Sequence, residues 1–135
     1  MELATIMKIS DLIIILSIIF ALFTFLFYGY HSQIEEKKVI REKGNFTIGI
    51  IIKKSATKGG MRRVYSEFVV QEKKYENKYN SVSQEFYNFH KLGDTIIINF
   101  LTLDLEKSMI LEDIEYKTCF GIPPSNGWKE LPNCK

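Results

Sequence analysis

An uninterrupted apolar run near the N-terminus constrains this chain more than any other feature. No charged residue occurs from Leu12 to Tyr30. At a rise of 1.5 Å per residue, these roughly nineteen residues form a helix of about 28 Å, close to the ~30 Å hydrocarbon core of a bilayer. A single segment in lipid must satisfy its backbone hydrogen bonds internally, which a helix does. The run therefore predicts a transmembrane helix.

Polar residues in and around the run agree with this prediction. The hydroxyls of Ser17 and Thr24 can donate to carbonyls one turn back, so they cost little in lipid. Tyr28 and Tyr30 stand where an aromatic belt meets the headgroups. The run contains no Asp, Glu, Lys, Arg or His, so it lacks the groups that line a transport path.

A buried core helix and a cleaved signal peptide are the alternatives to an uncleaved anchor. A domain of about one hundred residues is too small to cover an apolar helix on every side. The signal peptide is the closer alternative, because Lys8 supplies a basic residue ahead of the run. However, the run exceeds the about 7–15 apolar residues of a signal peptide, and Tyr28 and Tyr30 stand where the peptidase requires small residues. We expect an uncleaved anchor.

The charges beside the helix favour a cytoplasmic location for the domain that follows it. Lys37, Lys38, Arg41 and Lys43 follow the helix, whereas Lys8 and the amino terminus precede it. Cytoplasmic flanks of membrane helices carry an excess of Lys and Arg. This count alone would place the C-terminal domain in the cytoplasm.

The two cysteines favour the opposite orientation. Cys119 and Cys134 bracket a tail that holds all three prolines and has no regular periodicity. A disulfide closing a loop of about 15 residues would contribute ~3 kcal/mol, and it would persist only outside the reducing cytosol. Two unrelated free thiols are the alternative, and no further Cys or His lies at metal-ligand spacing. We give the disulfide more weight than the charges and expect an extracytoplasmic domain.

The length of 135 residues leaves one small domain behind the anchor. A net charge of +2 is too small an excess to indicate nucleic acid, which is bound by clustered Lys and Arg. The charged segment after the run is expected to extend the membrane helix as a stalk, or to lie along the headgroups, and Gly44 is expected to end it. The predicted parts are an N-terminal tail at 1–11, the transmembrane helix at 12–30, a charged juxtamembrane stalk at 31–44, a small β domain at 45–116 and a C-terminal tail at 117–135 that a disulfide can close.

Alternating apolar residues predict strands in the β domain. In the first strand Phe46, Ile48, Ile50 and Ile52 alternate with polar or small residues, which is typical of a half-buried strand. Further strands are predicted at 64–70, 75–81, 95–101 and 108–111, separated by turns at 55–60, 71–73, 92–95 and 104–107.

One short helical insertion interrupts the strands. Phe86, Phe89 and Leu92 recur every three residues, as they would on one side of a helix. Five short strands with one brief helix predict a small barrel or a strongly curled antiparallel sheet. The predicted fold class is an N-terminal transmembrane helix followed by a small, mostly β domain.

Short motifs follow one another in a recognisable order between Phe46 and Leu111. They are Thr47-Ile48-Gly49-Ile50, Tyr65 with Phe68 and Val70, Lys74-Tyr75, and Gly93-Asp94-Thr95-Ile96-Ile97-Ile98. This order resembles uncharacterised bacterial families of small, single-pass, membrane-anchored β-barrel proteins. The chain departs from them at Phe100 in place of tyrosine, at Lys73 in place of glycine, and at 103–107, which lacks their proline. The resemblance implies a compact barrel and no particular activity.

The sequence contains no pattern typical of a catalytic, cofactor or metal site. Gly59-Gly60 lacks the Lys-Ser/Thr pair of a phosphate loop. An acidic stretch lacks the central glycine of a calcium loop and is expected to be solvated; it comprises Asp104, Glu106, Glu112, Asp113 and Glu115. For His90 we expect a packing or surface role, with a pH-dependent switch as the alternative. We expect a non-enzymatic protein without cofactor or metal.

Basic residues gather around the first predicted hairpin. They form a candidate basic surface patch of Lys53, Lys54, Lys58, Arg62 and Arg63. Such charges protect edge strands from pairing with other chains, contact anionic headgroups, or, beside tyrosines, bind single-stranded nucleic acid. An extracytoplasmic domain disfavours nucleic acid, so we expect edge protection first and membrane contact second.

These features together predict a single-pass membrane protein that presents a small β domain at the membrane surface as a binding or accessory module. Its expected partners are the lipid bilayer and another protein, with no nucleic acid, and the sequence leaves its oligomeric state open. The alternative is an immunity-type protein that binds a toxin in the envelope.

Overall fold

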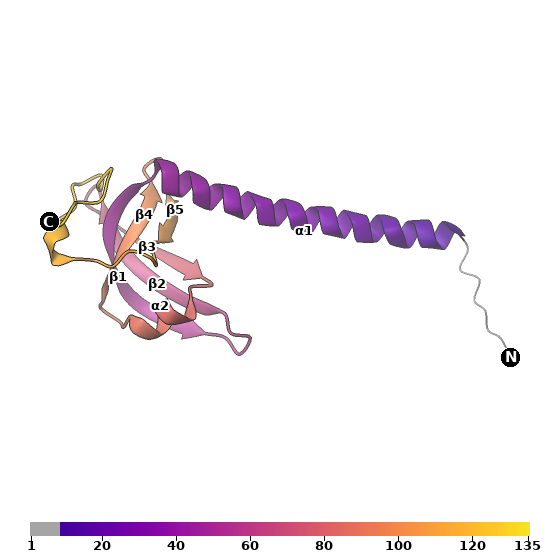
Figure 1. The fold of residues 1–135 in the computed structure, drawn as a ribbon, viewed down its shortest axis with the longest axis horizontal. Helices are drawn as coiled ribbons and strands as arrows, with labels where there is room; N and C mark the ends of the chain where they lie inside the picture. Colours follow the sequence, from indigo (N-terminus) through magenta and orange to yellow (C-terminus); the bar gives the residue numbers. More distant parts are fainter. Residues whose placement is uncertain (1–8) are drawn as a thin grey trace. The chain divides into compact units, whose positions relative to one another are not determined.

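A computed structural model describes residues 9–135 (Figure 1). Its elements are α1 (Ile9–Lys43), β1 (Asn45–Ala56), β2 (Arg62–Val70), β3 (Lys73–Asn80), α2 (Gln84–Phe89), β4 (Thr95–Leu101), β5 (Asp104–Ile110) and the short 3-10 helix η1 (Thr118–Phe120). The chain divides into two compact units, residues 1–36 and residues 37–135. Lys8 and the preceding part of the predicted N-terminal tail lie outside the described residues.

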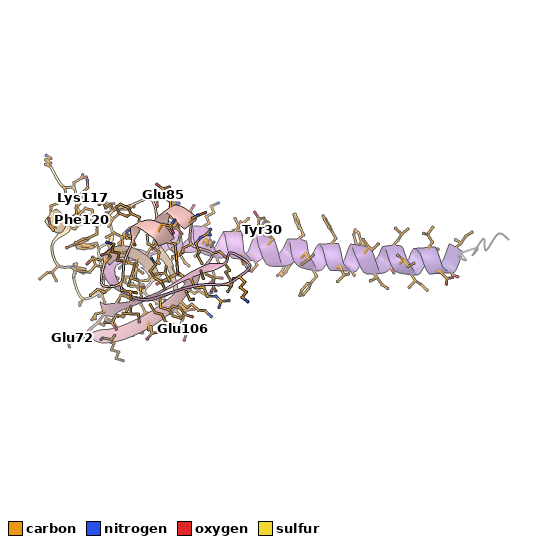
Figure 2. All side chains as sticks on the ribbon, turned by 90° about the horizontal axis from the view of Figure 1, so that it is seen from below. Tyr30, Glu72, Glu85, Glu106, Lys117 and Phe120 are labelled. Atoms are coloured by element: carbon orange, nitrogen blue, oxygen red, sulfur yellow. A yellow bond between two sulfur atoms is a disulfide. The ribbon has the colours of Figure 1, made fainter. Side chains whose placement is uncertain are left out.

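The apolar part of α1 exposes its side chains on every side. They project from the helix all around its axis (Figure 2), and no residue of its most apolar window is buried. As the sequence predicts, Ser17 Oγ donates to Ile14 O at 2.7 Å and Thr24 Oγ1 to Phe20 O at 2.8 Å. Within residues 9–135, α1 is the one helix long and apolar enough to span a membrane, properties that a signal sequence shares.

The helix continues without a break through the charged segment that follows the apolar run. Its 35 residues extend about 52 Å, well beyond the ~30 Å hydrocarbon core of a bilayer. Arg41 and Lys43 lie in the last turn, where positive charge stabilises the negative end of the helix dipole. Gly44 N donates to Ile40 O at 2.8 Å, and the helix ends there, as predicted.

The second unit contains a single antiparallel sheet of five strands in the order β3-β2-β1-β4-β5. The sheet curls into a nearly closed barrel, visible in Figure 1. All five strands and α2 contribute buried apolar side chains to one core: Ile51, Val64, Phe68, Val70, Tyr79, Val82, Phe86, Ile96, Ile98, Phe100 and Ile110. The predicted fold class, an apolar N-terminal helix before a small β domain with one helical insertion, is confirmed.

The buried residues of β1 differ from those that its apolar alternation favours. Thr47, Gly49 and Ile51 are buried, whereas Ile50 is 44% exposed. The core beside β1 already contains large side chains from its neighbours: a Cβ on Gly49 would overlap the side chain of Ile98. Small residues therefore face inward along the first half of β1, and apolar ones face outward.

A β-bulge changes which residues of β1 point into the core in the second half of the strand. The register with β2 shifts between Ile51, which pairs with Ser66, and Lys53, which pairs with the adjacent Tyr65. Ile52 is therefore the extra residue of the bulge. After the bulge Lys54 lies opposite the buried Val64, and Lys53 lies opposite Tyr65. Cross-strand partners share one side of a sheet, so Lys54 lies on the core side and Lys53 on the outer side.

The last strand begins earlier than the sequence predicts. Residues 104–107 are predicted as a turn, but Asp104 pairs with Leu101 and β5 runs from Asp104 to Ile110. The chain reverses over residues 102–103 instead. The charged residues of this segment resemble a turn in composition, yet an edge strand keeps such side chains in solvent.

Side chains join the two edge strands, β3 and β5. Asn77 Nδ2 donates to Ser108 Oγ and to the carbonyl oxygens of Leu105 and Glu106 at 3.4 and 3.5 Å. Tyr79 OH and Ser108 Oγ share a second hydrogen bond of 2.8 Å. This group of polar contacts, the β3–β5 seam, brings the sheet back upon itself.

The C-terminal tail is held by hydrogen bonds as well as by its cysteines. Trp128 exchanges two backbone hydrogen bonds of 2.7 Å with Phe46 at the start of β1. Gln71, in the β2–β3 turn, donates through Nε2 to Asn126 Oδ1 at 2.8 Å. Cys119 and Cys134 form a disulfide pair with a Cα–Cα distance of 5.8 Å, which agrees with the predicted bridge. The tail is therefore attached to the barrel at two sites far apart in sequence.

We predict that Asn77→Ala weakens the β3–β5 seam. The change removes the amide that bonds β5, and the free energy of unfolding should fall by about 1–3 kcal/mol. Denaturant unfolding of the full chain in detergent micelles, followed by circular dichroism, measures this loss. Glu76→Ala, at the exposed neighbouring position, should change stability by less than about 0.5 kcal/mol. Equal losses in the two variants would contradict a special role for Asn77.

A second prediction concerns the ionisation of the Tyr79 hydroxyl in the β3–β5 seam. Burial raises the pKa of Tyr79 above 10.0, against the opposing effect of its hydrogen bond to Ser108. Above about pH 10 the unfolded chain loses this proton while the folded chain retains it, so stability falls as the pH rises. The unfolding free energy of the full chain between about pH 8 and about pH 11 should therefore decline less steeply in Tyr79→Phe than in the parent protein. The half-buried, outer-side Tyr65→Phe is the control, and identical slopes for both variants would exclude the effect.

Candidate functional site

A cleft of about 240 Å³ opens beside α2. One wall comprises α2 and its flanking residues, with Ser83, Glu85, Phe86, Phe89 and His90. The other wall is the segment that follows β5, residues 112–115. Residues far apart in sequence thus form one concave surface on the β domain.

Side-chain hydrogen bonds fix the start of α2 against the opposite wall. Ser83 Oγ accepts from Phe86 N at 3.1 Å, as an N-cap residue does. The N–H of Ser83 in turn donates to both carboxylate oxygens of Glu112, at 3.1 and 3.2 Å. Glu112 therefore ties the two walls of the cleft together.

Lys54 holds the end of α2. Its Nζ donates to Tyr87 O and, at 2.6 Å, to His90 O, and it lies 4.2 Å from the centre of the Tyr87 ring. Carbonyls at a helix C-terminus lack intrahelical partners and attract cations. The bulge in β1 supplies this cation, because it turns Lys54 to the core side of the sheet.

Aromatic rings form the wall of the cleft along α2. The His90 ring stacks on Phe86 with a centroid distance of 4.0 Å, and Phe89 meets His90 edge-on at 5.2 Å. His90 Nδ1 lies 3.1 Å from Phe86 O. Phe86 is buried, but Phe89 is 69% exposed. His90 thus packs against the aromatic rings of α2, in line with the packing or surface role expected for it.

Four carboxylates line the cleft, and no lysine or arginine does. Glu112 accepts from Ser83, and Asp113 Oδ2 lies 2.9 Å from Arg41 Nη2 in an exposed ion pair. Among the ion pairs of residues 9–135, none involves Glu85 or Glu115. The cleft therefore carries an excess of negative charge.

The structure separates the acidic stretch that is continuous in the sequence. Asp104 and Glu106 belong to β5, whereas Glu112, Asp113 and Glu115 line the cleft. Sequence reasoning missed Glu85, which joins them from a different element. Its position in the first turn of the short predicted helix was visible, but the folding of that helix against residues 112–115 was not.

The residues of the candidate basic surface patch have different environments. Lys54 binds α2, and Arg62 Nε donates to Val82 O at 3.2 Å. Lys53 Nζ lies 5.2 Å from the centre of the Tyr65 ring. Arg63 Nη2 contacts Met61 Sδ at 3.4 Å, and Lys58 is exposed in the β1–β2 turn. Two of the five basic residues therefore bind backbone carbonyls of the segment around α2.

Neither a metal site within residues 9–135 nor a similar known protein was found. In the segment from 9 to 135, no three His, Cys, Asp or Glu side chains lie close enough together to hold a metal ion. No protein-family model, curated protein or solved structure matches this chain. The resemblance to membrane-anchored barrel families therefore remains a prediction from the motifs alone.

The two neighbouring lysines of β1 offer a test of how α2 is held. Lys54→Met leaves two carbonyls at the end of α2 without their donor, so the free energy of unfolding should fall by about 1–3 kcal/mol. Amide exchange in residues 84–90 should accelerate in the same variant. Lys53→Met removes the same charge from the outer side of the sheet and should change stability by less than about 0.5 kcal/mol. Unchanged amide exchange in Lys54→Met would contradict this role.

Proposed function

We propose that this chain is a single-pass membrane protein that presents its small β domain outside the cytoplasm to bind another protein. The observation that carries the proposal is α1, whose apolar run is exposed on every side and matches a bilayer in length. An exposed apolar cylinder of this length is stable in lipid, where the helix satisfies its own backbone. The function is non-enzymatic, and its binding surface is formed by the β domain.

The cysteine pair supports an extracytoplasmic location. Cys119 and Cys134 lie at disulfide distance, and they close the loop that carries Trp128 to the start of β1. Disulfides persist in oxidising compartments and are rare in the cytosol. The basic residues after the apolar run favour the opposite orientation. We give the cysteine pair more weight, because the tail that it closes belongs to the same folded unit as the cleft, and a bridge there would stabilise that unit.

The motif order supports the anchored architecture on which this proposal depends. The families that the chain resembles are small, single-pass and bacterial, and they have no assigned activity. Presenting a barrel near the membrane requires the anchor, the barrel and a recognition surface. Each of these has a counterpart in α1, the five-stranded sheet and the cleft beside α2.

We predict that the protein remains in the membrane after alkaline extraction and carries a protected disulfide. The anchor should keep the full-length chain in the pellet, because α1 is uncleaved. An impermeant maleimide applied to intact cells should label Cys119 and Cys134 only after reduction. A variant with both cysteines changed to serine is the control for labelling.

Two outcomes would contradict the proposal. Release of a shortened chain lacking residues 1–30 would show that α1 is a cleaved signal sequence. Labelling that requires lysis but no reductant would place the domain in the cytoplasm with free thiols. Either result is visible on a gel and does not depend on knowing the partner.

A further inference from the structure

We propose that the cleft beside α2 binds a basic segment of a partner protein, by seating a lysine or arginine side chain between Phe89 and the carboxylates of Glu85 and Glu115. This inference rests on the proposed function of the domain as a binding module. It names the site and the chemistry of the partner.

The unbalanced charge of the cleft is the first argument. Four carboxylates line it, of which Glu112 is bonded to Ser83 and Asp113 is paired with Arg41. Glu85 lies on one wall and Glu115 on the other, and neither is in an ion pair among residues 9–135. A cationic side chain complements this charge, and complementary potentials also speed association.

The apolar surface of the cleft is the second argument. Phe89 is 69% exposed although it belongs to the same helix as the buried Phe86, and Ile114 contributes from the opposite wall. Lysine and arginine carry long aliphatic stems that lie along apolar surface while their charged ends reach polar groups. A cation near an aromatic ring gains a further ~0.5–1 kcal/mol at exposed sites. Carboxylates beside an exposed phenylalanine therefore suit a lysine or arginine side chain better than a purely apolar side chain.

The size of the cleft also favours a side chain over a free metabolite. Its volume of about 240 Å³ is below the about 300–1,000 Å³ of typical small-molecule sites. The carboxylates do not converge on one point, since no three acidic, His or Cys side chains of residues 9–135 are close enough to hold a metal ion. An extended cation attached to a peptide chain fits such a spread of charge.

Both walls are held in place before any partner arrives. Glu112 joins the start of α2 to the opposite wall, and Lys54 holds the end of α2 against β1. Little ordering of the protein is then required on binding, which reduces the entropic cost of association. The site is therefore a fixed receptor for a basic side chain.

The test uses full-length protein in uncharged maltoside micelles and a fluorescent peptide of seven residues that alternates arginine with leucine. Fluorescence anisotropy should show saturable binding with a Kd below about 1 mM. The double change Glu85→Gln with Glu115→Gln should weaken binding about tenfold, and Phe89→Ala should weaken it about threefold to tenfold. Raising the salt concentration should weaken the parent complex more than the complex of the double variant.

The matched control is Glu76→Gln with Glu106→Gln, which removes the same two charges from β3 and β5. Glu106 lies well away from Glu85 on the β domain (Figure 2). This control should bind the peptide within about twofold of the parent protein. A peptide with glutamate in place of arginine should not bind.

Three results would overturn the inference. They are no saturable binding of the arginine peptide, equal binding by the parent and the cleft variants, and equal losses in the cleft variants and the control pair. The last would show general attraction of a basic peptide to acidic residues. Alkaline extraction and thiol labelling are unaffected by any of these results, so failure of the cleft is distinguishable from failure of the membrane-anchored module.

Discussion

The hydrogen bonds between Asn77, Tyr79 and Ser108 are the contacts on which the β domain depends, because they join strands that would otherwise be open edges. A five-stranded antiparallel sheet leaves backbone groups of its outer strands available for pairing with other chains. Here one amide and one phenol from β3 bond β5 instead. The core then becomes a closed interior in which Phe100, Ile98 and Val64 are almost entirely buried.

The cleft depends on a second local feature, the bulge in β1. If Ile52 followed the regular alternation of the strand, Lys54 would lie on the outer side, and the end of α2 would lack its cation. With the bulge, Lys54 binds the end of α2, while Glu112 binds Ser83 at its start. The bulge and Glu112 together therefore hold the helix that supplies Glu85 and Phe89 to the cleft.

The sequence predicts where helices and strands occur better than it predicts which strand residues point into the core. The length of the apolar run and the stop at Gly44 depend on neighbouring residues, and they agree with the structure. The turn predicted at 55–60 is shorter than expected, because Ser55 and Ala56 still pair with β2. The inward facing of Thr47 and Gly49 depends on the volume of Ile98 across the sheet, which no local pattern contains. For the same reason the cleft was not predicted: it exists only because Glu85 and residues 112–115 meet in the folded domain.

The bridge between Phe46 and Trp128 has a consequence for biosynthesis. A ribosome makes β1 early and the tail last, since chains emerge from the N-terminus onward. Contacts between distant residues also form slowly, because the intervening chain must first be ordered. The start of β1 thus acquires one of its partners only when translation is nearly complete. A chain truncated before Trp128 would keep the pairing of Phe46 with Asn99 of β4 but would lose both hydrogen bonds between Phe46 and the tail, so this edge of β1 is covered only after all five strands have been made.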